Sequence, residues 1–304
     1  MNGKGIGLGL MSGVLWGMDT AINSLLLLSV PFILTDSRLI SGALLLAFFH
    51  DFISADILLV DLLIRRELKQ SFKVLKTRSA KFLMLAALFA GPVGMRSYLY
   101  AVETIGSGLT ATISSLYPAL AAICGALLLK DYLNKRGWIG LGLIILSIAI
   151  LGFSQFSLHS SILMGILAAL LCVFGWASES VITAYGMQED IVPKQALLIR
   201  QCTSSLAYFI LMVFEGDLFF SFRAVVTSPN FGLVCIIGLI GTLSYFCYYS
   251  SIDRIGPVKA TGLNVTYSIW TAIFSLFLGG SGIDIRLILC GFLIIFGSSL
   301  MLKE

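Results

Sequence analysis

Charge is scarce in this chain. Of its 304 residues, 12% are Asp, Glu, Lys or Arg and 58% are hydrophobic, and the mean hydropathy is +0.98. A soluble domain carries about 25% charged and 45–50% apolar residues, so the composition excludes a soluble fold. The formal net charge of +4 is spread over many short polar seams, whereas a nucleic-acid-binding protein gathers its basic residues on one solvated face. Nucleic acid is therefore excluded as a partner.

The sequence also lacks the motifs of metal, nucleotide and catalytic sites. Its six cysteines form no CxxC pair, and as small buried hydrophobes they indicate neither disulfides nor metal. It contains no P-loop, no HExxH, no strand followed by GxGxxG and no Ser/His/Asp constellation. We therefore expect no metal, no cofactor and no enzyme activity.

Long apolar runs make up most of the chain. A helix needs roughly 17–25 apolar residues to cross a bilayer, and the runs lack the ten-residue alternation of barrel strands. The sequence thus predicts an all-α membrane protein of ten transmembrane helices. The expected spans are 6–28, 39–64, 80–102, 107–129, 136–153, 161–186, 194–214, 231–252, 257–279 and 285–302.

The basic residues predict the orientation, because Lys and Arg are enriched in cytoplasmic seams. With both termini cytoplasmic, 15 of the 20 basic residues fall on the inside. The largest cluster runs from Arg65 to Lys81. Arg96 and Arg200 fall within spans, where we expect them to balance buried acids.

An internal repeat divides the chain. Tyr98 to Gly106 recurs 150 residues later as Tyr248 to Gly256, and at an offset of 160 Trp16-Gly-Met-Asp19 matches Trp176-Ala-Ser-Glu179. Two five-helix halves, residues 1–153 and 154–304, are implied. An odd number of spans per half makes the second copy inverted, which is typical of transporters that bind substrate near the midplane.

Ionisable residues at membrane depth are candidate functional groups, because lipid cannot solvate them. Trp176, Glu179 and Thr183 share one helix face, and Trp16, Asp19 and Asn23 repeat the arrangement. We expect these faces to form opposite walls of one cavity. The alternative is that Glu179 or Asp19 only pairs with Arg96 or Arg200.

Aromatic residues lie near the centres of the same spans. Tyr245 and Tyr248 lie one turn apart, and Asn264, Tyr267, Trp270 and Phe274 form a stripe in the ninth span. Rings around a carboxylate attract a cation by about 0.5–2 kcal/mol each. A quaternary ammonium fits best because it donates no hydrogen bonds, although such a stripe can also serve only for packing or as an interfacial belt.

Three further features have more limited interpretations. His50-Asp51 is a candidate for proton relay or a satisfied structural pair, and Gln201 is a candidate partner for a ligand hydroxyl. Gly5, Gly9, Gly13 and Gly17 form a small-residue ridge, which favours close helix packing.

The chain resembles the drug/metabolite transporter (DMT) superfamily, EamA type, over its whole length. Sharper segments are His50-Asp51-Phe52, Ala90-Gly91-Pro92-Val93-Gly94-Met95, Trp176-Ala-Ser-Glu179-Ser180, Ala196-Leu-Leu-Ile-Arg200-Gln201 and Lys259 to Thr271. These segments are similar to the LicB-type choline permeases of bacteria that decorate teichoic acid or lipopolysaccharide with phosphocholine.

The resemblance implies a secondary-active transporter in the bacterial plasma membrane. It would import choline by alternating access, coupled to protons, and supply a cytoplasmic choline kinase. The expected proton-coupling residues are Asp19, His50, Asp51 and Glu179. The expected substrate contacts are Trp16, Tyr98, Trp176, Glu179, Gln201, Tyr245, Tyr248, Asn264, Tyr267 and Trp270. The alternatives are an exporter of amino acids or organic cations and an intramembrane enzyme acting on lipid head groups.

Overall fold

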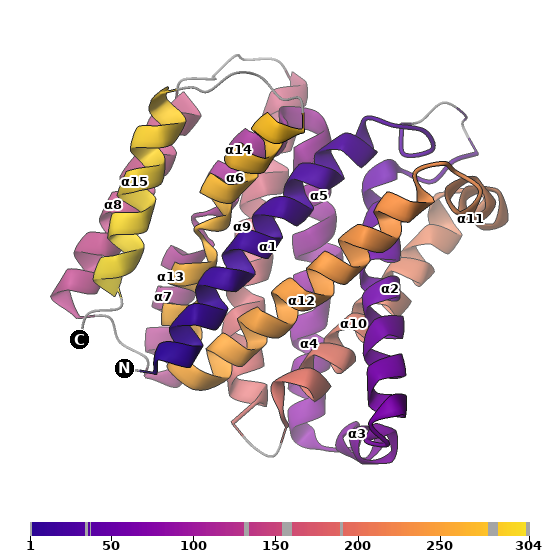
Figure 1. The fold of residues 1–304 in the computed structure, drawn as a ribbon, viewed down its shortest axis with the longest axis horizontal. Helices are drawn as coiled ribbons and strands as arrows, with labels where there is room; N and C mark the ends of the chain where they lie inside the picture. The colour runs from indigo at the N-terminus through magenta and orange to yellow at the C-terminus, as the bar shows by residue number, and fades with distance from the viewer. Residues whose placement is uncertain are drawn as a thin grey trace.

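The computed structural model describes residues 2–33, 36, 38–130, 134–153, 160–188, 191–278 and 285–301, and the regular structure within them is helical (Figure 1). The all-helical class is therefore confirmed. The elements are α1 (Gly3–Leu27), α2 (Gly42–Ile64), α3 (Leu68–Val74), α4 (Arg78–Leu88), the π-helical turn η1 (Phe89–Met95), α5 (Arg96–Ile105), α6 (Ser107–Ser114), α7 (Tyr117–Leu129), α8 (Lys135–Phe153), α9 (Ser160–Gly186), α10 (Pro193–Glu215), α11 (Leu218–Val226), α12 (Phe231–Ile255), α13 (Pro257–Asn264), α14 (Tyr267–Phe277) and α15 (Ile285–Met301).

Seven segments of the described chain are long and apolar enough to cross a membrane, judged by length and composition. They are Gly3–Leu27, Gly42–Ile64, Arg78–Ile105, Ser107–Leu129, Ile162–Gly186, Pro193–Glu215 and Phe231–Ile255. The other three expected spans hold α8, the pair α13 and α14, and α15. The protein is thus a multi-pass membrane protein, while the count of ten crossings stays a prediction.

The glycine ridge of α1 packs against α12, α13 and α14, as expected. A Cβ atom added to Gly13 would lie 2.5 Å from Oγ1 of Thr266, and one added to Gly17 would lie 2.4 Å from Cβ of Trp270. Glycine at these positions lets the helices approach closely enough to bring Trp16 into the centre of the bundle.

Two interrupted helices lie at equivalent places in the repeat. The turns into α6 and α13 are made by Gly106 and Gly256, whose φ angles of +81° and +83° favour glycine. Residues 115–116 separate α6 from α7, and residues 265–266 separate α13 from α14. The 150-residue offset in the sequence therefore reappears in the backbone. Residues 154–159, just after the predicted boundary, lie outside the described residues.

The turn η1 shapes the wall against which Trp176 packs. Pro92 lies inside it and has no backbone N–H to donate, and π-helical turns are frequent at functional sites. A Cβ on Gly94 would lie 2.6 Å from Cδ1 of Trp176. The missing side chain therefore makes room for the indole ring of α9.

Candidate functional site

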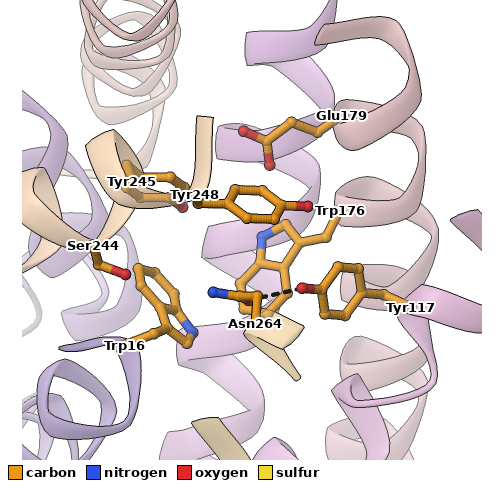
Figure 2. A pocket seen from close by; sticks show the side chains of 8 residues that line it. All are labelled: Trp16, Tyr117, Trp176, Glu179, Ser244, Tyr245, Tyr248 and Asn264. Atoms are coloured by element: carbon orange, nitrogen blue, oxygen red, sulfur yellow. Dashed lines mark hydrogen bonds between the residues drawn. The ribbon is translucent and has the colours of Figure 1, made fainter. Parts of the chain in front are cut away.

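A pocket inside the helical bundle brings together most of the residues singled out by the repeat. Figure 2 shows eight side chains that line it: Trp16, Tyr117, Trp176, Glu179, Ser244, Tyr245, Tyr248 and Asn264. They come from α1, α7, α9, α12 and α13. The two repeat-related tryptophans meet edge to face, with ring centroids of Trp16 and Trp176 5.5 Å apart.

Glu179 is the single carboxylate among these eight residues, and it is 2% exposed. The hydroxyl of Tyr249 donates a hydrogen bond of 2.8 Å to its Oε1. Nε of Arg200 lies 3.6 Å from the same oxygen. The described lining thus holds five aromatic rings, whose faces are electronegative, one buried carboxylate and no basic side chain.

The interrupted helices cross at the pocket through reciprocal hydrogen bonds. Tyr117 donates to Oδ1 of Asn264 at 2.7 Å, and the hydroxyls of Tyr267 and Ser114 lie 2.5 Å apart. Tyr117 and Tyr267 are equivalent in the repeat, as are Ser114 and Asn264. The equivalent contacts therefore link one copy to the other, but Asn264 lines the pocket and Ser114 does not.

Four residues expected to contact substrate lie outside the described lining. Tyr98 packs behind Trp176, with ring centroids 4.8 Å apart. Gln201 donates to Ser54 at 2.7 Å and accepts from Arg200. Tyr267 is held by Ser114, and Trp270 packs beside Phe274 with ring centroids 6.3 Å apart. Their contact with substrate stays a prediction.

Three residues of the site were not singled out from the sequence. Tyr117 precedes Tyr267 by 150 residues, which is the offset of the repeat and a usable signal for its position. Tyr249 follows Tyr248 in the recurring segment, but nothing in that pattern identifies it as the donor to Glu179. No sequence signal identifies Ser244.

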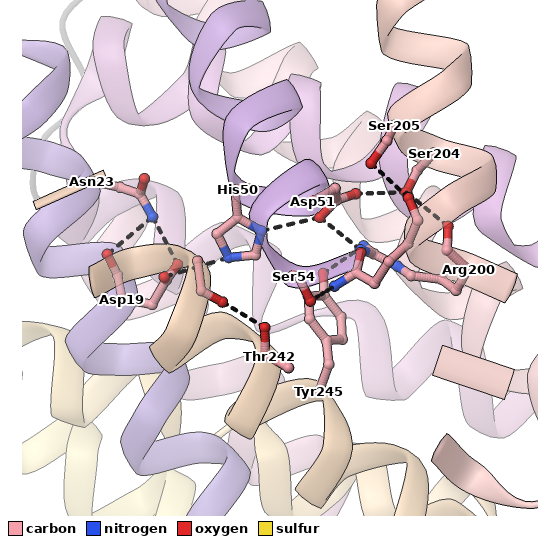
Figure 3. Close-up of polar contacts among 12 residues, drawn as sticks. Asp19, Asn23, His50, Asp51, Ser54, Arg200, Ser204, Ser205, Thr242 and Tyr245 are labelled. Carbon is pink, nitrogen blue, oxygen red and sulfur yellow. Dashed lines mark hydrogen bonds and ion pairs between the residues drawn. The ribbon is translucent and has the colours of Figure 1, made fainter. Parts of the chain in front are cut away.

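Beside the pocket runs a chain of buried ionisable groups (Figure 3). Oδ1 of Asp19 lies 3.4 Å from Nε2 of His50, and Nδ1 of His50 lies 3.0 Å from Oδ1 of Asp51. Nη1 of Arg200 donates to Oδ1 of Asp51 at 2.8 Å. Together with the contact from Arg200 to Glu179, these groups join α1, α2, α10 and α9.

The expected role of Arg96 as a partner of the buried acids is wrong. Its Nη2 donates to Oε2 of Glu215 at 2.9 Å, and its side chain is 38% exposed. Arg200, by contrast, is fully buried and contacts both Asp51 and Glu179. Both arginines lie within apolar runs of the sequence, so this position alone did not predict that Arg200 is buried and Arg96 is peripheral.

Comparison with known proteins agrees with this architecture. The model of the EamA-like transporter family matches residues 3–153 and again residues 163–303. The chain belongs to the EamA-like transporter family. Its two matches cover nearly the whole chain, and membership of a transporter family is consistent with the expectation that the protein is not an enzyme.

Two further comparisons are informative. The chain is 30% identical over 267 residues to Protein LicB of Haemophilus influenzae (strain ATCC 51907 / DSM 11121 / KW20 / Rd), which covers 88% of this chain and 86% of that protein. A crystal structure of another protein superposes with a TM-score of 0.71 at 16% identity, covering 97% of this chain and 94% of its own. The latter similarity supports the fold alone.

Proposed function

We propose that this EamA-like protein imports choline, or a quaternary ammonium of similar size, across the bacterial plasma membrane. The observation that carries the proposal is the pocket of five aromatic rings around buried Glu179. A quaternary ammonium needs a diffuse negative potential, which ring faces and one carboxylate supply. Ser244 and Asn264 offer polar groups for the hydroxyl of choline.

Alternating access is the mechanism that the repeat supports. The proposed halves, residues 1–153 and 154–304, correspond to the two family matches and meet at the pocket through the interrupted helices. Rocking of one half against the other would open the pocket to either side in turn. We propose ten crossings with both termini cytoplasmic, which is consistent with α1 beginning and α15 ending toward the same side of the bundle (Figure 1).

Proton coupling is proposed through the buried chain of Asp19, His50, Asp51 and Glu179. The ring of His50 touches a wall of the pocket, with its centroid 6.0 Å from that of Trp16. A change of protonation at His50 or Asp19 can therefore alter the packing of that wall. Choline imported in this way would supply a cytoplasmic choline kinase.

Uptake into proteoliposomes tests the proposal. Labelled choline should accumulate, and accumulation should increase with an inward proton gradient. Competition by unlabelled amines should fall as methyl groups are removed, from choline through dimethylethanolamine to ethanolamine. Equal competition by ethanolamine, or stronger competition by a neutral aromatic amino acid, would contradict the proposed substrate.

The two alternatives predict different outcomes in the same vesicles. An exporter would drive choline or an amino acid out of the compartment that corresponds to the cytoplasm. A lipid head-group enzyme would change the phospholipids of the vesicle without net transport, which chromatography of extracted lipid would reveal.

A further inference from the structure

We propose that Arg200 is an internal cation that screens Glu179 in the empty pocket and withdraws toward Asp51 when a cationic substrate arrives. Substrate binding is then an exchange of one cation for another at Glu179. This inference rests on the proposed function, because it takes the substrate to be a cation bound at Glu179.

The proposed substrate would contact Tyr245 and Glu179 from within the pocket. Arg200 contacts the same two residues from outside the described lining. Its Cζ lies 4.1 Å from the centroid of the Tyr245 ring, and its Nε lies 3.6 Å from Oε1 of Glu179. Both Tyr245 and Glu179 line the pocket, whereas Arg200 is absent from the described lining. The guanidinium therefore uses the ring and carboxylate attractions that a bound quaternary ammonium would use.

The two carboxylates hold Arg200 unequally. Nη1 donates to Asp51 at 2.8 Å, and Oδ2 of Asp51 also accepts from Ser204 at 2.6 Å. Nε, which faces Glu179, is buried and has no hydrogen-bond partner among the described residues. Arg200 is thus held by hydrogen bonds to Asp51, to Gln201 and to the hydroxyl of Tyr245, whereas its described contact with Glu179 is an ion pair without a hydrogen bond. A side-chain movement that lengthens the contact with Glu179 can therefore keep the hydrogen bond to Asp51.

The charges explain why the exchange is favoured. A buried carboxylate without a counter-charge is strongly destabilising, so Glu179 needs Arg200 while the pocket is empty. A substrate cation beside Glu179 would repel the guanidinium a few ångströms away, and Asp51 supplies a place for it. A neutral molecule of the same shape would exert no such repulsion, so it would leave Arg200 beside Glu179.

Calorimetry with choline on purified protein tests the exchange. Asp51→Asn removes the place to which Arg200 withdraws, so choline should bind about tenfold more weakly. Asp51→Asn combined with Arg200→Gln leaves the local net charge unchanged and removes the competing cation. This double variant should bind choline roughly threefold or more tightly than the wild type. Arg200→Lys keeps the positive charge but loses the planar guanidinium that lies over Tyr245, so it should not show the tighter binding of the double variant.

Whether the double variant binds choline more tightly or more weakly than the wild type distinguishes cation exchange from a purely structural role of Arg200. If Arg200 only supports the helices, the folded double variant would bind choline more weakly than the wild type, which would overturn the inference. Asp51→Asn is close in shape to the native residue, and unchanged affinity in that variant would also overturn it. Failure of the wild type to bind choline would contradict the proposed substrate. The series would then use tetramethylammonium, and failure to bind either cation would contradict both proposals.

Discussion

Asp19 and Glu179 stand at matching places in two copies of one motif, three residues after a tryptophan, but their neighbours differ. The two tryptophans line the pocket together, as the repeat predicts. Glu179 lines it too, with Tyr249 donating to its carboxylate. Asp19 lies outside the described lining, accepts from Asn23 at 2.7 Å and faces His50.

The two acids thus have different surroundings at matching positions of the repeat. In the second copy the acid, Glu179, lies beside the aromatic rings of the pocket and shares Arg200 with Asp51. Its carboxylate therefore lines the pocket. In the first copy the acid pairs with a histidine of α2, where a Cβ on Gly241 of α12 would lie 2.0 Å from Nε2 of His50. We infer that Glu179 binds the substrate and that Asp19 serves the coupling.

The sharpest test of this division is Glu179→Gln. Removing the charged partner of a desolvated cation costs about 3 kcal/mol or more, which is roughly a hundredfold in affinity. Calorimetry with choline should therefore show a loss of at least that size. Asp19→Asn is the matched control, and an equal loss in both variants would contradict the division of roles.

Trp176→Ala should have the next largest effect. A desolvated cation over an indole ring gains about 1–2 kcal/mol, so choline binding should weaken roughly five- to thirtyfold. Trp176→Phe should be milder because it keeps an aromatic face. Unchanged affinity in a correctly folded Ala variant would assign the ring to packing.

Asp19→Asn should change coupling rather than binding. We expect choline affinity within about threefold of the wild type, because the side chain lies outside the described lining and its charge acts only at a distance. The pH dependence of uptake should flatten between roughly pH 5.5 and 8, where a histidine or a buried acid titrates. Asp36 lies outside the spans and does not contribute to this pH dependence. Hydrogen bonds from Arg38 lower the pKa of its carboxyl to about 2, so it stays ionised throughout this pH range. Unchanged pH dependence in Asp19→Asn would direct the search to His50 and Asp51.

The fold was largely predictable because membrane helices follow from composition alone. Helices lie in each of the ten expected ranges, and the glycine ridge of α1 packs as its spacing indicates. The convergence of Trp16, Trp176 and Glu179 also followed from the repeat, since equivalent positions of related halves meet near their axis.

The direction of individual side chains was less predictable. Periodicity indicated a single stripe of Asn264, Tyr267 and Trp270, but the break at residues 265–266 changes the helical register between the first two. The partners of Asp19, Arg96 and Arg200 depend on neighbouring helices, which a sequence does not position. Sequence analysis could thus identify Asp19, Glu179 and Arg200 as buried charges but not the peripheral position of Arg96, and the pairing of these groups required the structure.

Trp270→Ala should have the smallest effect on choline affinity. It tests whether the sequence pattern or the pocket lining identifies the residues that bind substrate. The sequence expectation places Trp270 against the substrate, which would make its loss comparable to that of Trp176. The geometry places its backbone and Cβ against Gly17 and its ring beside Phe274, outside the described lining of the pocket. From this geometry we expect choline affinity within about twofold of the wild type, with the cost appearing as lower thermal stability because the half-buried ring loses apolar contacts. Calorimetry and a melting curve on the same preparation decide between them. A tenfold loss of affinity with unchanged melting would show that Trp270 reaches the substrate and that the stripe, not the pocket lining, marks the binding residues of α14.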